Sequence, residues 1–343
     1  MQYRKLGNTG LFVSNMCLGT MTFGGKGFWK KIGALDQTDA NGLVARALDH
    51  GINFIDTADV YSEGLAEEIT GRALKESSVR RSDVVLATKG FAPMGKGPND
   101  RGASRGHIMN AVKESLRRLD TDYIDLYQIH GLDTLTPVEE TLRALDDLIR
   151  AGHIRYIGIS NWPAWATMKA ICLARAHNWS APASVQAYYT VVGRDIEREL
   201  IPLIKAEDLA LLVWSPLAGG LLSGKFRSSS AEKGARRADF DFPPVDNVRA
   251  NSVLSVIESI ALTRNVSVAQ ISLAWLLYQK AVTSIILGVK NFAQLDDNLA
   301  SAAFEFTPEE LDLLDSASKL SEEYPGWIMR YQSEEARVAL GAK

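Results

Sequence analysis

Short apolar runs alternate with longer amphipathic segments along most of this chain. Regular alternation of strands and helices implies right-handed parallel crossovers, and eight such units close into a (β/α)8 barrel. The sequence therefore predicts an α/β protein with the TIM-barrel fold. The predicted strands are residues 15–18, 53–56, 84–89, 123–129, 156–159, 184–187, 210–214 and 282–287. The predicted helices are residues 38–49, 66–74, 104–119, 137–151, 164–177, 196–207, 251–263, 268–279 and 292–300.

The segment after the first strand argues against the rival architecture, an open doubly wound sheet. Such a sheet places its phosphate-binding glycines directly before a helix. Here the glycine-rich residues 19–25 lead into a long loop, residues 19–35, with Phe23, Phe28 and Trp29. A loop of this length is expected to be functional. The barrel is the favoured fold.

Two segments outside the repeat are predicted to lie at the barrel ends. Residues 3–13 carry a Gly-Asn-Thr-Gly turn between β-prone pieces, which predicts an N-terminal β-hairpin cap. Residues 308–343 form a C-terminal extension that we expect to fold over one barrel mouth. A chain of 343 residues with 46% hydrophobic content can form one large core, so we expect residues 1–343 to be a single domain.

Charge and cysteine content indicate the class of partner and the compartment. The formal charge of −3 gives no basic excess for nucleic acid or an anionic membrane, so the expected partner is a small molecule. Cys17 and Cys172 lie in apolar surroundings, which fits reduced thiols better than a disulfide. No apolar signal segment follows the first residues. We expect a cytoplasmic protein.

Polar or aromatic residues end six successive predicted strands. In a barrel, the active site is built at the carboxyl ends of the strands. Any one of these residues alone could be a helix cap or a surface group, but their coincidence predicts a site at this face. They are Asp56, Lys89, His130, Ser160 with Asn161, Gln186, and Trp214 with Ser215.

An aspartate, a tyrosine, a lysine and a histidine together fit proton transfer to a carbonyl oxygen as a hydride arrives. A free phenol has a pKa of about 10, and a neighbouring cation lowers it. We expect Lys89 to supply that charge to Tyr61, and Asp56 to hold the ammonium. His130 would donate a hydrogen bond to the carbonyl. Tyr61 is then the proton donor.

A metal site is the alternative use of these side chains. Asp56, Asp59 and His130 could be written as ligands. The chain has only five histidines, and Lys89 ends the adjacent strand. Proton transfer is favoured, and no metal is predicted.

The motifs around these residues resemble the aldo-keto reductase superfamily over nearly the whole chain, from residue 6 to about residue 300. The similarity is greater to the potassium-channel β-subunit-like and bacterial general-reductase branches than to the mammalian aldose reductases. The resemblance implies a (β/α)8 barrel, a nicotinamide cofactor, and the four catalytic roles argued above. The motifs are residues 51–58 with Tyr61, Ala87-Thr88-Lys89, Gln128-Ile129-His130, Gly158-Ile159-Ser160-Asn161 and residues 214–220.

The resemblance also implies a cofactor site. Lys290, near a helix start, could meet a 2′-phosphate, which favours NADPH (NADP+) over NADH. The carboxamide would be held by Ser160, Asn161 and Gln186, with Trp214 stacked on the nicotinamide. The pyrophosphate would lie on Ser215, Leu217, Gly219 and Lys225, with Arg236 as a clamp. Further predicted contacts are Thr20, Met21, Asp56, Pro216, Ala218, Gly288, Gln294, Asp297 and Asn298.

Two departures from the family pattern border the expected substrate pocket. After the tyrosine the family usually has Gly-x-Gly-x-Ser-Glu, whereas residues 62–67 read Ser-Glu-Gly-Leu-Ala-Glu. The aromatic loop at residues 23–31 is also extended. Aromatic residues near the mouth predict a pocket for bulky carbonyl compounds, and about half of them are expected to touch ligand. They are Phe23, Phe28, Trp29, Phe91, Trp162 and Tyr188.

The predicted function is NADPH-dependent reduction of an aldehyde or ketone. The alternative is a cofactor-binding regulatory subunit resembling the potassium-channel β-subunits, with little turnover. Those subunits usually have asparagine at the position of His130, so the histidine favours turnover. A barrel with a decayed site is a third possibility that the four matching strand ends disfavour. An oligomer is possible, because no pattern in the sequence decides the oligomeric state.

Overall fold

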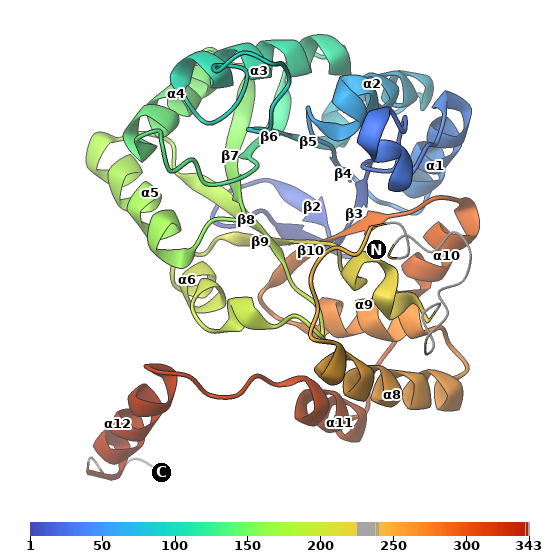
Figure 1. Ribbon diagram of the computed structural model, residues 1–343, viewed down its shortest axis with the longest axis vertical. Coiled ribbons are helices and arrows are strands. Elements are labelled where there is room, and N and C mark those ends of the chain that lie inside the picture. The colour runs from blue at the N-terminus through green and yellow to red at the C-terminus, as the bar shows by residue number, and fades with distance from the viewer. Residues whose placement is uncertain (225–236, 238–239, 340, 342–343) are drawn as a thin grey trace.

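Parallel strands close into a barrel in the computed structural model, which describes residues 1–224, 237, 240–339 and 341 (Figure 1). The predicted α/β TIM-barrel fold is confirmed. Each strand pairs in parallel with its two neighbours. In spatial order the strands are β10 (Val282–Gly288), β3 (Met16–Gly19), β4 (Phe54–Asp56), β5 (Val85–Gly90), β6 (Ile124–Ile129), β7 (Ile154–Ser160), β8 (Pro182–Tyr188) and β9 (Ala210–Trp214).

Helices surround the barrel in the order of the chain (Figure 1). Their inner faces carry the apolar residues, because burying each large apolar side chain stabilises the fold by about 1.5–3 kcal/mol. In α4, for example, Leu142, Leu145 and Leu148 are buried. The helices of the ring are α1 (Gln37–Asp49), α2 (Leu65–Glu76), α3 (Arg105–Leu119), α4 (Val138–Arg150), α5 (Ala164–His177), α6 (Leu200–Ala206), α8 (Asn247–Arg264), α9 (Val268–Tyr278) and α10 (Phe292–Ala300).

The helix predicted at residues 196–207 is divided in the structure. A 3-10 turn, η4 (Asp195–Glu197), comes first, and α6 begins only at Leu200. Pro202 explains the start, because proline lacks an N–H and is tolerated only within the first helical turn. The helix predicted from residue 251 starts earlier, at Asn247, because the Asp246 side chain accepts hydrogen bonds from the first backbone N–H groups.

The N-terminal hairpin is present as predicted and covers the barrel end where the strands begin. β1 (Tyr3–Lys5) and β2 (Phe12–Ser14) pair antiparallel. Gly7, in the turn, has φ +59°, and a Cβ there would lie 2.5 Å from the Ala183 carbonyl oxygen. The hairpin turn therefore packs on the barrel backbone so closely that a glycine is required.

The C-terminal extension is present, but it does not fold over a barrel mouth as expected. α11 (Pro308–Ser318) packs against α8 on the outside of the barrel, where Leu314 is buried. α12 (Gly326–Ala339) lies away from the barrel in Figure 1. Its aromatic residues Trp327 and Tyr331 are exposed. The correction has a simple physical reason: the buried apolar face of the extension belongs to α11, which holds the chain to the outer ring.

Within the described ranges, no single helix has the length and apolar character needed to cross a membrane. Only α8 and α9 taken together meet that criterion, and the pair is bent by 104°.

Candidate active site

A buried ion pair lies at the carboxyl ends of β4 and β5. Lys89 Nζ is 2.5 Å from Asp56 Oδ1 and donates a second hydrogen bond to the Thr57 carbonyl at 2.8 Å. The Lys89 side chain is completely buried. Since a buried charge needs both a partner and hydrogen bonds, Asp56 compensates for the burial of Lys89.

Two glutamine amides hold the other oxygen of Asp56. Gln128 Nε2 and Gln186 Nε2 each donate to Oδ2 at 3.0 Å, and Gln186 Nε2 also lies 3.1 Å from Gln128 Oε1. The sequence prediction assigned Gln186 to the cofactor and gave Gln128 no role. The sequence signal for Gln128 was its place in the motif Gln128-Ile129-His130, near the end of a predicted strand. The strand register explains why Gln128 belongs to the site, because Gln128 pairs with Lys89 on one side and with Gly158 on the other.

Tyr61 lies beside this ion pair, in the short 3-10 turn η2 (Tyr61–Gly64). Lys89 Nζ is 5.1 Å from the centre of the Tyr61 ring. Burial by itself lowers the pKa of Lys89, but Asp56 and Tyr61 outweigh this effect and hold the pKa above its ordinary value. The lysine therefore stays positively charged next to the phenol, and a positive charge there favours ionisation of the phenol.

His130 completes the group at the end of β6. Its ring centre is 5.9 Å from that of Tyr61. Burial lowers the pKa of His130 to about 3, and the charge of Lys89 acts in the same direction. The imidazole is therefore neutral near pH 7 and can donate only one hydrogen bond. Its Nδ1 has no hydrogen-bond partner among the described residues.

A cavity of about 490 Å³ opens directly above these side chains. Asp56, Tyr61 and His130 line it, whereas Lys89 lies behind them in the barrel. Most of the residues predicted to bind cofactor line the same cavity. These are Thr20, Met21, Ser160, Asn161, Gln186, Trp214, Ser215, Pro216, Leu217, Gly219, Gly288, Lys290, Gln294, Asp297 and Asn298.

Three predicted cofactor residues are not on the cavity wall that the structure describes. Ala218 is fully buried and does not line the cavity. Lys225 and Arg236 lie outside the described residues.

The position of the Trp214 indole is fixed by Asn161. Trp214 Nε1 donates to Asn161 Oδ1 at 3.0 Å, and Asn161 Nδ2 donates to the His130 carbonyl at 3.1 Å. Phe242 stacks on Trp214 with a centroid distance of 5.8 Å and an angle of 6°. The sequence prediction missed Phe240 and Phe242, which also line the cavity. They fall in a long polar stretch without periodicity, so no sequence signal pointed to them.

The loop after β9 turns tightly beside the cavity and is held by its own hydrogen bonds. Ser215 and Gly219 have φ values of +51° and +67°. Ser215 Oγ accepts a hydrogen bond from Gly219 N–H at 2.9 Å. A Cβ at Gly219 would lie 2.3 Å from the Phe242 carbonyl oxygen, so only glycine fits there.

At the far end of the cavity, the start of α10 is held by its own side chains. Asn291 is the N-cap and accepts from Gln294 N–H at 2.9 Å. The Gln294 side chain in turn accepts from Lys290 N–H at 2.9 Å. The Asp297 carboxylate accepts from Ser267 Oγ at 2.8 Å and so is already hydrogen-bonded. A helix start with a lysine beside it is a suitable place for a phosphate.

These residues fit an extended dinucleotide. Thr20 Oγ1 is buried, belongs to a residue that lines the cavity, and has no hydrogen-bond partner among the described residues. A Cβ at Gly288 would meet no atom within 4 Å, so the wall there is open. A polar ligand that donates to Thr20 and runs toward α10 would use both features.

The predicted substrate aromatics separate into two groups. Phe28 and Trp29 line the cavity. The other four do not line it. Phe23 is fully buried in the core, Phe91 packs close to Gly131, Trp162 is 4% exposed, and Tyr188 lies against Trp214 with a centroid distance of 5.2 Å.

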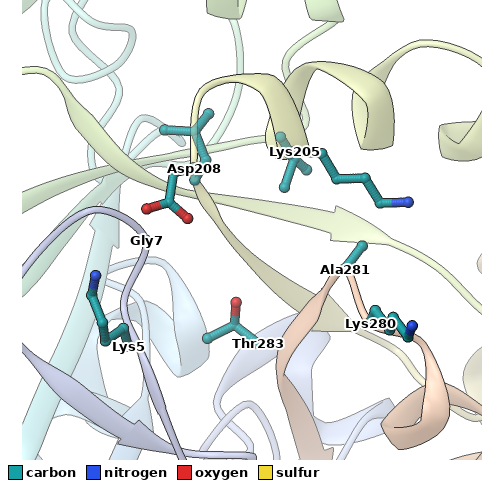
Figure 2. A pocket seen from close by; sticks show the side chains of 9 residues that line it. Lys5, Gly7, Lys205, Asp208, Lys280, Ala281 and Thr283 are labelled. Carbon is teal, nitrogen blue, oxygen red and sulfur yellow. The ribbon is translucent and has the colours of Figure 1, made fainter.

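A second, smaller cavity of about 300 Å³ lies at the opposite end of the barrel. It adjoins the residues before β9 and β10 and the N-terminal hairpin. Figure 2 shows that Lys5, Lys205 and Lys280 come from three segments and that their nitrogen atoms do not meet at one point. None of the residues predicted for the active site lines this cavity.

Within residues 1–224, 237, 240–339 and 341, no three His, Cys, Asp or Glu side chains are grouped so that they could hold a metal ion.

Comparison with known proteins gives matches along most of the chain. Residues 15–319 match the family described as "Aldo/keto reductase family". A protein of Arabidopsis thaliana named "Probable voltage-gated potassium channel subunit beta" is 38% identical over 87% of this chain and 90% of its own length. "Uncharacterized oxidoreductase YrpG" of Bacillus subtilis (strain 168) is 36% identical over 92% and 95%. "Versiconal hemiacetal acetate reductase" of Aspergillus parasiticus is 33% identical over 95% and 99%.

Proposed function

Because this chain belongs to the aldo/keto reductase family and is an NAD(P)H-dependent oxidoreductase, we propose that it reduces an aldehyde or ketone to the alcohol with NADPH. Tyr61 is the proton donor in this proposal. The observation that carries it is the contact of Tyr61 with a fully buried, positively charged Lys89 at the wall of the cavity. A catalytic acid works best when its pKa lies near the working pH, and Lys89 moves a phenol in that direction.

The nicotinamide would supply a hydride to the carbonyl carbon. Tyr61 gives its proton to the carbonyl oxygen, so the O–H bond of the phenol breaks as that of the alcohol forms. The Lys89 ammonium stabilises the phenolate that remains. His130 is neutral, because its pKa is lowered to about 3, and so it offers a hydrogen bond without competing as an acid. Asp56, held by Gln128 and Gln186, keeps Lys89 in place.

The preference for NADPH is supported by the residue next to the start of α10. Lys290 lines the cavity directly before the N-cap Asn291. A 2′-phosphate placed there would meet both a lysine and the positive end of a helix dipole. The predicted contacts of Ser160, Asn161, Gln186 and Trp214 with the nicotinamide remain part of this proposal.

The substrate is proposed to be a bulky, aromatic carbonyl compound. Phe28, Trp29 and Phe240 line the cavity together with Tyr61, and Phe28 is half exposed whereas Tyr61 is buried. Neighbouring rings are in contact. The ring centroids of Trp29 and Tyr61 are 5.1 Å apart, and those of Phe28 and Phe240 are 5.2 Å apart. Flat ring faces of this kind favour stacking of an aromatic ligand.

The location of the protein is proposed to be cytoplasmic. Both cysteines are free thiols, which supports this proposal.

Replacing Tyr61 by Phe tests the proposed proton donor. We expect kcat for NADPH-dependent reduction of 4-nitrobenzaldehyde to fall by about 10²–10⁴-fold, the usual contribution of a general acid. NADPH binding, measured by quenching of tryptophan fluorescence, should be unchanged. Tyr278→Phe, an exposed tyrosine on α9, is the matched control. Reduction by Tyr61→Phe at the rate of the parent would show that another group donates the proton.

Assays of NADPH binding and NADPH oxidation by the parent protein also distinguish the proposed reductase function from the alternative function. The similarity to the potassium channel subunit named above favours a cofactor-binding regulatory protein with little turnover. That function predicts NADPH binding with no oxidation of NADPH by any carbonyl compound in a panel of sugars, polycyclic ketones and aromatic aldehydes.

A further inference from the structure

The loop at residues 19–35 is closed at its base and carries aromatic side chains at its tip. Gly24 N–H donates to the Leu35 carbonyl at 2.8 Å and joins the two ends of the loop. The tip is the 3-10 turn η1 (Gly27–Lys31). Phe28 and Trp29 in this turn line the cavity. The loop is therefore a formed element, and its position relative to Tyr61 depends on contacts between the loop and the segment after Tyr61.

Ser62, the residue after the proposed proton donor, makes such contacts. Its Oγ donates to the Phe23 carbonyl at 2.6 Å and accepts from Gly25 N–H at 2.9 Å. The Ser62 side chain is completely buried. One hydroxyl thus joins the segment that carries Tyr61 to the loop that carries Trp29. Hydrogen bonds in a buried position are costly to break, because the freed groups cannot turn to water.

The backbone at Ser62 has a conformation that is unfavourable for a serine. Its φ and ψ are 51° and 33°, and Glu63 follows with φ 55°. Side chains other than glycine adopt this left-handed conformation only at a cost in free energy. Glycine, which the family pattern has at this position, would avoid the cost but would also lack the hydroxyl. The two hydrogen bonds offset the strain.

A second link between the two segments is weaker. Lys26 Nζ lies 3.1 Å from Glu63 Oε2, but both side chains are more than half exposed. Exposed ion pairs contribute little. The rings of Trp29 and Tyr61 are also in contact, with a centroid distance of 5.1 Å. Ser62 supplies the two buried hydrogen bonds to the residues directly before the tip, so its removal should loosen the loop relative to Tyr61.

We propose that Ser62 is a positioning residue that fixes Trp29 against Tyr61 and thereby sets the selectivity for aromatic over small aliphatic carbonyl compounds. The selectivity rests on the proposed reductase function, whereas the link between the two segments does not. An aromatic substrate needs the Trp29 ring at a defined distance from the proton donor. A small aliphatic aldehyde has no ring to stack on Trp29, so its reduction depends less on the position of that ring.

The test compares two substrates in Ser62→Gly, which removes the hydroxyl and the backbone strain together. We expect KM for 4-nitrobenzaldehyde to rise about tenfold, the effect of losing one or two hydrogen bonds. The kcat and KM for propanal should stay within about twofold. Ser255→Ala, which removes an exposed hydroxyl bonded within its own helix, is the control. Ser62→Ala keeps the strain and should show the same change in KM with a lower melting temperature.

Hydrogen exchange of the loop gives a readout that needs no turnover. The Gly25 amide donates to Ser62 Oγ, so exchange in residues 23–35 should be faster in Ser62→Gly than in the parent. Equal losses with both substrates would show a purely structural role and overturn the proposal. So would unchanged KM values with unchanged exchange. If the parent reduces no carbonyl, the proposed function and the selectivity fail together, and the exchange data still decide whether Ser62 holds the loop.

Discussion

Lys89 is the residue on which the chemistry of the site depends. Its ammonium is fully buried and has one carboxylate partner, Asp56. Removing one partner of a buried ion pair leaves an uncompensated charge and costs about 3–5 kcal/mol. The two amides on Asp56 therefore serve catalysis indirectly, because they hold the carboxylate that keeps Lys89 charged beside Tyr61.

Asp59, two residues before Tyr61, is a buried carboxyl that the proposed reaction does not use. Its side-chain oxygens have no side-chain hydrogen-bond partner among the described residues, and only the adjacent Val60 N–H favours their charged form by hydrogen bonding. Burial, with the nearby charge of Glu67, raises the pKa of Asp59 to about 8, although Arg118 and Lys89 act in the opposite direction. An aspartate in the unfolded chain has a pKa of about 4. The folded protein therefore binds a proton more tightly here than the unfolded chain does.

Replacing Asp59 by Asn should make stability less dependent on pH. Between pH 4 and pH 8 the unfolded chain loses this proton first, so the contribution of Asp59 to the free energy of unfolding falls as pH rises. We expect Asp59→Asn to be more stable than the parent by about 1–3 kcal/mol at pH 8, with a smaller difference at pH 5. Urea unfolding followed by tryptophan fluorescence measures the free energy of unfolding at both pH values. Asp312→Asn, at an exposed site, should show no such trend. A variant less stable than the parent at pH 8 contradicts this account.

At the scale of elements, the site is built by strand register. Asp56, Lys89 and Gln128 come from three neighbouring strands. Lys89 pairs with Gln128, whereas Asp56 pairs with Ala87, two residues before Lys89, and the side chains of Lys89 and Gln128 both reach Asp56. Gly158, the next partner of Gln128, leaves room for it, because a Cβ there would lie 2.7 Å from Gln128 Cγ. A shift of one residue in any of these pairings would turn a polar side chain away from the interior of the barrel.

The C-terminal helix α12 is expected to be dispensable for catalysis. Its aromatic residues Trp327 and Tyr331 are exposed, and the helix lies away from the barrel. A chain that ends at Glu323 should keep kcat/KM for 4-nitrobenzaldehyde within about twofold and its melting temperature within about 2 °C. A chain that ends at Phe306 also loses the buried Leu314 and should be clearly less stable. A loss of activity above tenfold in the chain that ends at Glu323 would show that α12 lies over the barrel mouth in solution.

At the scale of the whole molecule, cofactor binding should stabilise the fold. The cavity joins Thr20, directly after the first strand of the barrel, and Gly288, at the end of the last strand, to the start of α10. A ligand that binds only the folded state stabilises it by about 2.7 kcal/mol when its concentration is a hundred times Kd. Since the cofactor would bridge the first and last strands of the barrel, melting temperature is a direct measure of its binding.

Lys290→Met should reduce the difference between the stabilisation by NADPH and the stabilisation by NADH. In the parent we expect saturating NADPH to raise the melting temperature by about 5 °C, and NADH at the same concentration to raise it less. In Lys290→Met the increase with NADPH should fall toward that with NADH, because the partner of the 2′-phosphate is lost. Lys280→Met, at the cavity on the opposite end of the barrel, is the control. Equal shifts by the two cofactors in the parent would contradict the preference for NADPH.

The sequence by itself determined the barrel and the strand ends that bear polar groups. The apolar runs and their spacing are local, so they indicated where strands end, and Asp56, Lys89 and His130 could be named from them. The packing of α11 and the contact between Phe28 and Phe240 were decided only by the tertiary structure. These features join residues far apart in the chain, and no local pattern reports such contacts.

Ser62 shows the same limit at a single residue. The sequence showed only that a serine stands where the family usually has glycine. The structure shows a left-handed backbone and a hydroxyl bonded to Phe23 and Gly25, residues nearly forty positions away. A dihedral angle and a long-range hydrogen bond are properties of the folded chain. The sequence determined that the segment after Tyr61 is unusual, and only the fold decided that it holds the aromatic loop.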